Sequence, residues 1–235
     1  SEHLWPIWSR DGRWVYFSSN AGSGAYNIFR KRADGSGDEQ RVSNSAMTQQ
    51  PSSISPNGST LLYTALGVTD SNAEWLLPLA PPGKPCAILK QETGLGVGPR
   101  ISPDGRWQTY YADGGNGEFE VFVMPFPDSH GSRWQVSTGG GYWPDWSPDG
   151  HTLYYYSGDM VMATAVGADA SGAFSFQPPH ALFALHSPEY PGDTGAPFTP
   201  LPDGSFLVDA LTGDSSGSAA PPIAVTTGWT QSLMH

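Results

Sequence analysis

The chain has few residues of the kinds that build disulfide scaffolds, membrane spans or nucleic-acid contacts. Cys86 is the one cysteine among 235 residues, so no internal disulfide can form. No run of 18 apolar residues occurs, so we expect no transmembrane helix, and no signal peptide is recognised. Lys and Arg number 11 against 22 Asp and Glu, a formal net charge of −11. Such a surface repels phosphate backbones, which argues against nucleic acid and anionic membranes. It suits a cationic partner, a metal ion or a neutral ligand, or serves solubility alone.

Gly and Pro are abundant and recur at fixed places, because a five-residue motif repeats along the chain. It reads WSRDG, ISPNG, ISPDG, WSPDG and, in a degenerate fifth copy, LPDG preceded by Pro200. Its closing glycines are Gly12, Gly58, Gly105, Gly150 and Gly204, at steps of 46, 47, 45 and 54 residues. Pro presets the backbone of a turn, Asp or Asn hydrogen-bonds the backbone ahead, and Gly accepts the left-handed conformation that closes it. The motif therefore predicts a tight connection between two strands.

Each motif is followed by an apolar, β-prone stretch, a polar or Gly-rich loop and a third strand, and in four units by a fourth strand. Four short strands per repeat of 40–50 residues are typical of a propeller blade. We expect an all-β fold, a single β-propeller domain over 1–235. Consecutive apolar residues fit blades that pack on both faces. A β-sandwich would not explain the regular spacing. The expected blades are approximately 3–47, 48–94, 95–139, 140–186 and 187–235.

How the ring closes stays open. Only five motifs are visible, and the last unit has no evident fourth strand. A strand from the N-terminus could complete the last blade, but the first inner strand needs most of residues 3–7. Either five blades close loosely, or a longer parent protein supplies a sixth.

The motif, followed by an aromatic strand and a YNIF or EVFV strand, resembles TolB-type propeller repeats. A closer resemblance is to the C-terminal propeller of bacterial, acidobacterial-type, membrane-anchored serine/threonine kinases. The residues that carry it are 120–141, 75–79 and 222–230. This resemblance implies a periplasmic or extracellular domain for sensing or protein binding, with an additional blade upstream in longer relatives. The chain has no kinase motif of its own.

Patterns of catalysis and metal binding are weak. Residues 213–217 read GDSSG, which fits a nucleophile elbow, but they lie in a Gly/Ser loop without the helix that an elbow requires. One short loop brings together three oxygen-bearing side chains, those of Asp113, Asn116 and Glu118, and is a weak candidate for a Ca²⁺ site. The loop at 34–38 is a second weak candidate. Both loops also have the composition of ordinary turns. No pair of histidines has metal-ligand spacing. We expect no cofactor beyond this possible Ca²⁺.

The inner strands offer the candidate binding residues. Four residues before each turn Asp or Asn stand Ile7, Ser53, Arg100, Asp145 and Thr199, and we expect them to line the central channel. Arg100 and Asp145 come from neighbouring blades, so they can form an ion pair or recognise a ligand.

Aromatic residues near one rim are a second candidate surface. Trp5, Tyr142 and Trp143 fall close to the start of inner strands, where they can pack or bind a partner.

The favoured function is a non-catalytic binding or scaffolding propeller for a protein or a small neutral or cationic ligand. The alternatives are a propeller enzyme acting on carbohydrate, which needs two carboxylates at the channel mouth, and a structural subunit of a larger extracellular assembly.

Overall fold

The structure is a computed structural model and describes residues 1–22, 24–66, 72–90, 96, 98–128, 132–186, 196–209 and 224–226. All regular elements in these ranges are β-strands arranged in five antiparallel sheets. None of the described residues forms a helix that is long and apolar enough to cross a membrane. The all-β propeller predicted from the repeat is confirmed.

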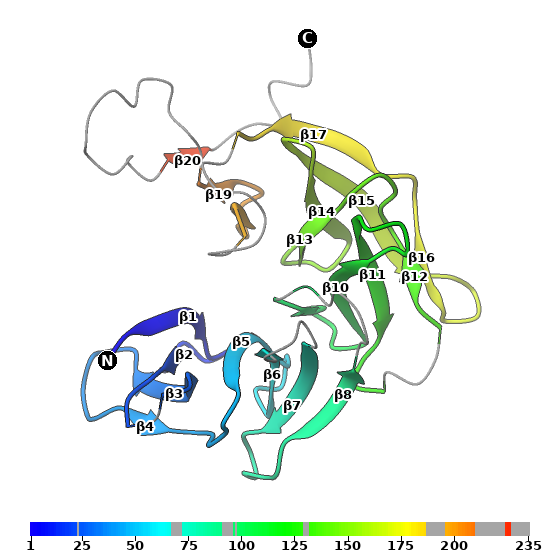
Figure 1. Ribbon diagram of the computed structural model, residues 1–235. Helices are drawn as coiled ribbons and strands as arrows, with labels where there is room; N and C mark the ends of the chain where they lie inside the picture. Colours follow the sequence, from blue (N-terminus) through cyan, green and yellow to red (C-terminus); the bar gives the residue numbers. More distant parts are fainter. Residues whose placement is uncertain are drawn as a thin grey trace.

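The five sheets follow one another in chain order around a common centre, with β1, β5 and β13 on the inner side (Figure 1). We call them blades 1 to 5. Blade 1 comprises β1 (His3–Trp8), β2 (Trp14–Ser19), β3 (Asn27–Arg32) and β4 (Gln40–Arg41). Blade 2 comprises β5 (Thr48–Ile54), β6 (Thr60–Leu66), β7 (Ala73–Pro78) and β8 (Cys86–Lys90). Blade 3 comprises β9 (Arg100–Ile101), β10 (Trp107–Asp113), β11 (Phe119–Pro125) and β12 (Trp134–Gln135).

Blades 4 and 5 depart from the four-strand pattern. Blade 4 comprises β13 (Tyr142–Trp146), β14 (Thr152–Ser157), β15 (Met160–Ala168), β16 (Phe174–Phe176) and β17 (His180–Ala184). β15 is long enough to pair with β17 along one part and with β16 along another, an extra strand that the repeat did not predict. Blade 5 comprises β18 (Phe198–Pro200), β19 (Phe206–Val208) and β20 (Ala224–Thr226). Residues 227–235, which follow β20, lie outside the described residues, so the single-domain assignment stays a prediction.

The repeated motif forms the same turn in all five blades. The amide of the closing glycine donates to the carbonyl three residues earlier at 2.8–3.0 Å, and the glycine φ lies between 67° and 82°. In blade 4 the Ser147 hydroxyl donates to Asp149 at 2.5 Å and accepts the Thr152 amide at 2.9 Å. The Asp side chain also accepts the amide of His151 at 3.0 Å. These bonds satisfy the polar groups of the turn and connect β13 to β14 without a longer loop.

Apolar clusters fill the seams between successive blades, and adjacent residues of one strand face opposite seams. Tyr110 packs toward blade 2 and Tyr111 toward blade 4, while Tyr155 packs toward blade 3 and Tyr156 toward blade 5. This arrangement explains the consecutive apolar residues of the sequence, because each middle blade is buried on both faces.

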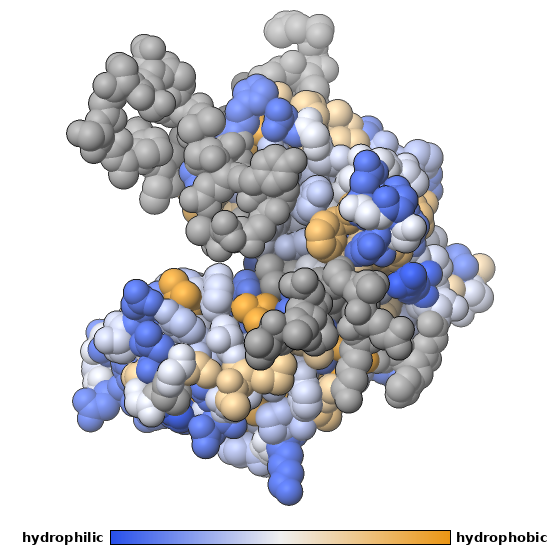
Figure 2. All heavy atoms as spheres, in the orientation of Figure 1, coloured by the Kyte–Doolittle hydropathy of each residue, from blue (hydrophilic) through white to orange (hydrophobic). Residues whose placement is uncertain are grey.

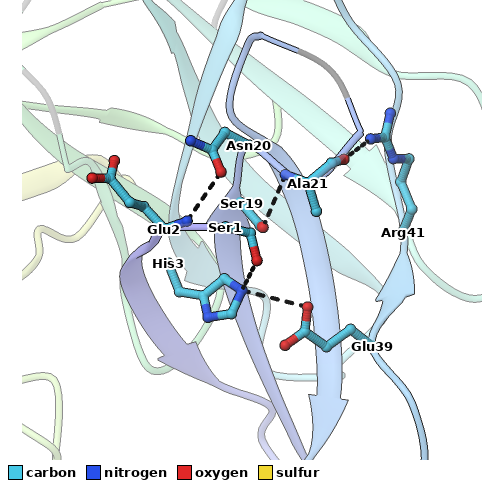
Figure 3. A network of polar contacts seen from close by, with 8 residues as sticks. All are labelled: Ser1, Glu2, His3, Ser19, Asn20, Ala21, Glu39 and Arg41. Carbon is cyan, nitrogen blue, oxygen red and sulfur yellow. Dashed lines mark hydrogen bonds and ion pairs between the residues drawn. The ribbon is translucent and has the colours of Figure 1, made fainter.

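Polar contacts hold the first strand to its blade (Figure 3). The Glu2 amide donates to Asn20 Oδ1 at 3.0 Å, and the His3 imidazole lies between the Ser1 hydroxyl at 3.3 Å and the Glu39 carboxylate at 3.4 Å. β1 pairs with β2, with Trp8 opposite Val15. The N-terminal residues therefore form the inner strand of blade 1 and not the outer strand of another blade.

The outward face of blade 1, which points away from blade 2, is not covered by another blade among the described residues. Trp8 is 62% exposed and Leu4 is 38% exposed. On the side of the molecule drawn in Figure 2, hydrophobic surface forms separate patches among hydrophilic residues. The residues equivalent to Trp8 in blades 2, 3 and 4 are Ile54, Ile101 and Trp146. Each packs against the preceding blade and is at most 5% exposed.

Candidate functional site

The inner strands of all five blades converge on one cavity of about 540 Å³. Ile7, Ser53, Arg100, Asp145 and Thr199 all line it, one from each blade. The five equivalent positions therefore lie around one cavity, and their role in binding stays a prediction. The wall also contains serines and prolines of the turns and the indoles of Trp8 and Trp146.

Arg100 is the most connected residue of the channel. Its Nε lies 3.8 Å from Asp145 Oδ2 in blade 4, and its Nη1 donates to the Ser52 carbonyl in blade 2. Its own carbonyl accepts the indole N–H of Trp146 at 3.1 Å. One side chain thus joins three successive blades at the axis, and the ion pair that the sequence suggested is formed.

The ion pair is only partly shielded from water, with side-chain exposure of 29% for Arg100 and 21% for Asp145. Burial raises the pKa of Asp145, while the Arg100 guanidinium, the Trp146 amide and the more distant Arg10 oppose that rise. Two arginines and one aspartate are the charged residues of the described lining. The channel therefore has a positive formal balance within a chain whose net charge is −11.

A shared backbone feature turns the inner strands toward the channel. Trp5 and Trp143 have φ values of 51° and 52°, and each precedes a proline at the same distance from its turn Asp; Gly98, with φ of 80°, precedes Pro99 at the equivalent place in blade 3. The pairing of β1 and of β13 shifts register at the tryptophan and the proline that follows it. Such bulges reorient the residues that follow, here Ile7 and Asp145.

The aromatic residues expected at the rim take part in packing. Trp143 is 6% exposed and its ring lies 5.4 Å from that of Tyr111 in blade 3, so of the two roles that the sequence left open this residue has the packing one. Tyr142 is half-buried, 5.8 Å from Tyr111. Trp5 is half-buried, 6.4 Å from Tyr26. Trp143 is covered because blade 3 packs against it with aromatic side chains.

The loop proposed for Ca²⁺ is organised as a turn. Asp113 Oδ1 accepts the amides of Gly115 and Gly117 at 2.7 and 3.1 Å, and Asn116 Oδ1 accepts the amide of Glu118 at 3.1 Å. In the loop at 34–38, Asp34 likewise accepts the amide and hydroxyl of Ser36. Within the described ranges, no group of three or more His, Cys, Asp or Glu is gathered so that it could hold a metal ion. The GDSSG segment at 213–217 lies outside those ranges.

The sequence reasoning missed one feature of the site and one of a neighbouring seam. The first is the hydrogen bond that the Trp146 indole donates to the neighbouring blade. The Trp in the first position of the motif was the sequence feature that could have indicated it. The second is a buried pair across the seam of blades 2 and 3, in which Gln108 Nε2 donates to Glu74 Oε2 at 2.8 Å. A Glu flanked by apolar residues in the third strand was the available signal for that pair.

No family model and no curated protein matches the chain, whereas solved structures do. TolB from Acinetobacter baumannii is 17% identical with a TM-score of 0.60, and the match covers 89% of this chain and 52% of that one. A puromycin-hydrolyzing peptidase of Mycobacterium tuberculosis is 17% identical with a TM-score of 0.59, over 88% of this chain and 35% of the peptidase.

A functionally unknown protein of Desulfotomaculum acetoxidans DSM 771 is 14% identical with a TM-score of 0.56, over 89% and 66%. The chain thus spans between about a third and two thirds of the length of these proteins. At such identities the likeness is one of fold, and that fold is a β-propeller similar to the one in TolB.

Proposed function

We propose that this chain is a non-catalytic binding propeller whose channel receives a short polar segment of a partner protein or a small neutral ligand. The observation that carries the proposal is the convergence of five equivalent inner-strand positions on one cavity, with Arg100 and Asp145 side by side in it. A ligand with both an acceptor and a donor can engage this pair without leaving either charge unpaired.

The lining refines the class of ligand expected from net charge. The acidic surface suits cationic partners, but the channel holds two arginines and one aspartate, whose positive balance disfavours a cationic group there. Of the neutral and cationic small ligands expected, the neutral one is therefore favoured. A carbohydrate-cleaving enzyme is less favoured, because the described lining offers a single carboxylate, Asp145, where a glycosidase uses two. The TolB-like fold and the kinase-type resemblance support a periplasmic or extracellular setting, within a larger protein.

The proposal is tested by titrating isotope-labelled protein with matched short peptides that are neutral, cationic or anionic, and with neutral oligosaccharides. NMR signals of the Trp8 and Trp146 indoles report on the channel. We expect saturable shifts of these signals with a neutral peptide. Arg100→Met should weaken binding about tenfold, equal to about 1.4 kcal/mol. Arg106→Met is the matched control, since Arg106 stacks on Trp107 away from the channel. Binding that shifts neither indole would contradict the proposal, as would turnover of an oligosaccharide.

A further inference from the structure

The seam between blades 2 and 3 is built differently from the others. The seams of blades 1 and 2, 3 and 4, and 4 and 5 each contain one continuous apolar cluster. The seam of blades 2 and 3 contains two smaller clusters, one around Leu62 and Leu76 and one around Tyr110 and Phe122. The same two blades place Glu74 and Gln108 in this seam.

Glu74 and Gln108 are fully buried and joined by one hydrogen bond, from Gln108 Nε2 to Glu74 Oε2 at 2.8 Å. Gln108 Nε2 also lies 3.0 Å from the Met124 sulfur. The other two oxygens of the pair, Glu74 Oε1 and Gln108 Oε1, have no hydrogen-bond partner among the described residues. The Thr64 hydroxyl, opposite Glu74 on β6, has none either. Orphaned buried oxygens are costly, so this pair requires a donor.

A proton on Glu74 supplies that donor. A protonated Glu74 Oε1 can donate to Gln108 Oε1, which closes a two-bond ring between the acid and the amide and satisfies both orphaned oxygens. An ionised carboxylate would instead present lone pairs to the amide oxygen and carry an uncompensated charge.

Burial of Glu74 favours its neutral, protonated form. Burial raises the pKa of Glu74 to about 8, and the hydrogen bond from Gln108 only partly opposes it. The ionisable side chain that interacts with Glu74 is Tyr110 of β10, which in turn interacts with Arg133, just before β12. Burial raises the pKa of Tyr110, Arg133 lowers it, and the charge of Glu74 raises it further. Arg133 thus acts on Tyr110, and no cation of the described residues lowers the pKa of Glu74 itself.

Glu120 provides the contrast within the same molecule. It is the second residue of β11, as Glu74 is of β7, and it is also buried, at 2% exposure. Its carboxylate accepts the Ser137 hydroxyl and the amides of Gly139 and Gly140, the latter two at 2.8 and 3.2 Å. Glu120 has the donors that a carboxylate needs, and Glu74 lacks them.

We propose that Glu74 is a proton-dependent latch, which as a neutral acid holds blades 2 and 3 together through Gln108 and on ionisation weakens their seam. The folded state keeps a proton that the unfolded chain loses above the ordinary pKa of 4.5. The stabilisation is therefore complete below that value and is lost as the pH rises toward about 8. The inference is independent of any ligand of the channel.

The test compares urea unfolding midpoints of the wild type, Glu74→Gln and Glu120→Gln from about pH 5 to about pH 9. The wild-type midpoint should fall with rising pH relative to Glu74→Gln, since a glutamine keeps a neutral pair with Gln108 at every pH. Glu120→Gln should keep the wild-type slope. Equal slopes in the wild type and Glu74→Gln would overturn the proposal.

A second measurement on the wild type does not depend on the folding of a variant. In protein with ¹³C-labelled glutamate carboxyls, one resonance should titrate near pH 8. Titration of every glutamate below about pH 6 would overturn the proposal, because it would show that the buried carboxyl is ionised at neutral pH.

Discussion

At the scale of single residues, environment assigns different roles to side chains that the repeat makes equivalent. Glu74 and Glu120 occupy equivalent positions in their blades. Glu74 meets the amide of Gln108 across a seam, whereas Glu120 accepts several hydrogen bonds. Trp8 and Trp146 stand at matching places in the motif, yet one is 62% and the other 5% exposed. Sequence equivalence predicts where a side chain lies within its blade but not what covers it.

The serine of the turn motif should contribute measurably to stability. Ser147→Ala removes the hydroxyl that joins Asp149 to the Thr152 amide, so the free energy of unfolding should fall by about 1–2 kcal/mol. Ser36→Ala is the matched control, because Ser36 also donates to an aspartate at 2.6 Å but in an exposed loop away from the inner strands. We expect less than about 0.5 kcal/mol there. Equal losses in the two variants, measured by urea unfolding, would show that the motif serine has no special role.

At the scale of elements, the inner strands of blades 3 and 4 are each hydrogen-bonded to the blade before them. The Trp146 indole donates to the Arg100 carbonyl, and the Ile101 amide donates to the Ser53 hydroxyl at 3.2 Å. Blade 1 has no such partner among the described residues, which leaves Trp8 on the surface.

The two motif tryptophans should therefore differ sharply on truncation. Trp146→Ala opens a cavity beside Trp107 and Phe174 and removes a donor to blade 3, so it should cost about 3–5 kcal/mol of unfolding free energy. Trp8→Ala should cost less than about 1 kcal/mol. Thermal unfolding of both variants checks this difference. A large loss for Trp8→Ala would mean that the outward face of blade 1 is covered in solution.

The repeat made the elements predictable, and departures from it account for what was missed. Turn chemistry at Gly12, Gly58, Gly105 and Gly150 identified the strand connections, since that chemistry is local. β16 was missed because its pairing depends on the extra length of β15. The channel positions followed from strand periodicity, whereas the burial of Trp143 depends on Tyr111 of another blade and has no local signal.

At the scale of the whole molecule, the blades form an arc whose interior is both the structural axis and the candidate site. Its cavity has a wall from all five blades, and the Arg100–Asp145 pair sits where blades 3 and 4 meet. Arg100 also contacts Ser52 of blade 2, so its side chain joins blades 2, 3 and 4 at the axis.

The most direct test of this account is a crystal structure of the chain. The account predicts that Ile7, Ser53, Arg100, Asp145 and Thr199 surround one cavity, with a motif turn beside each of them. Two sheets packed face to face, with these five residues scattered over separate surfaces, would contradict it.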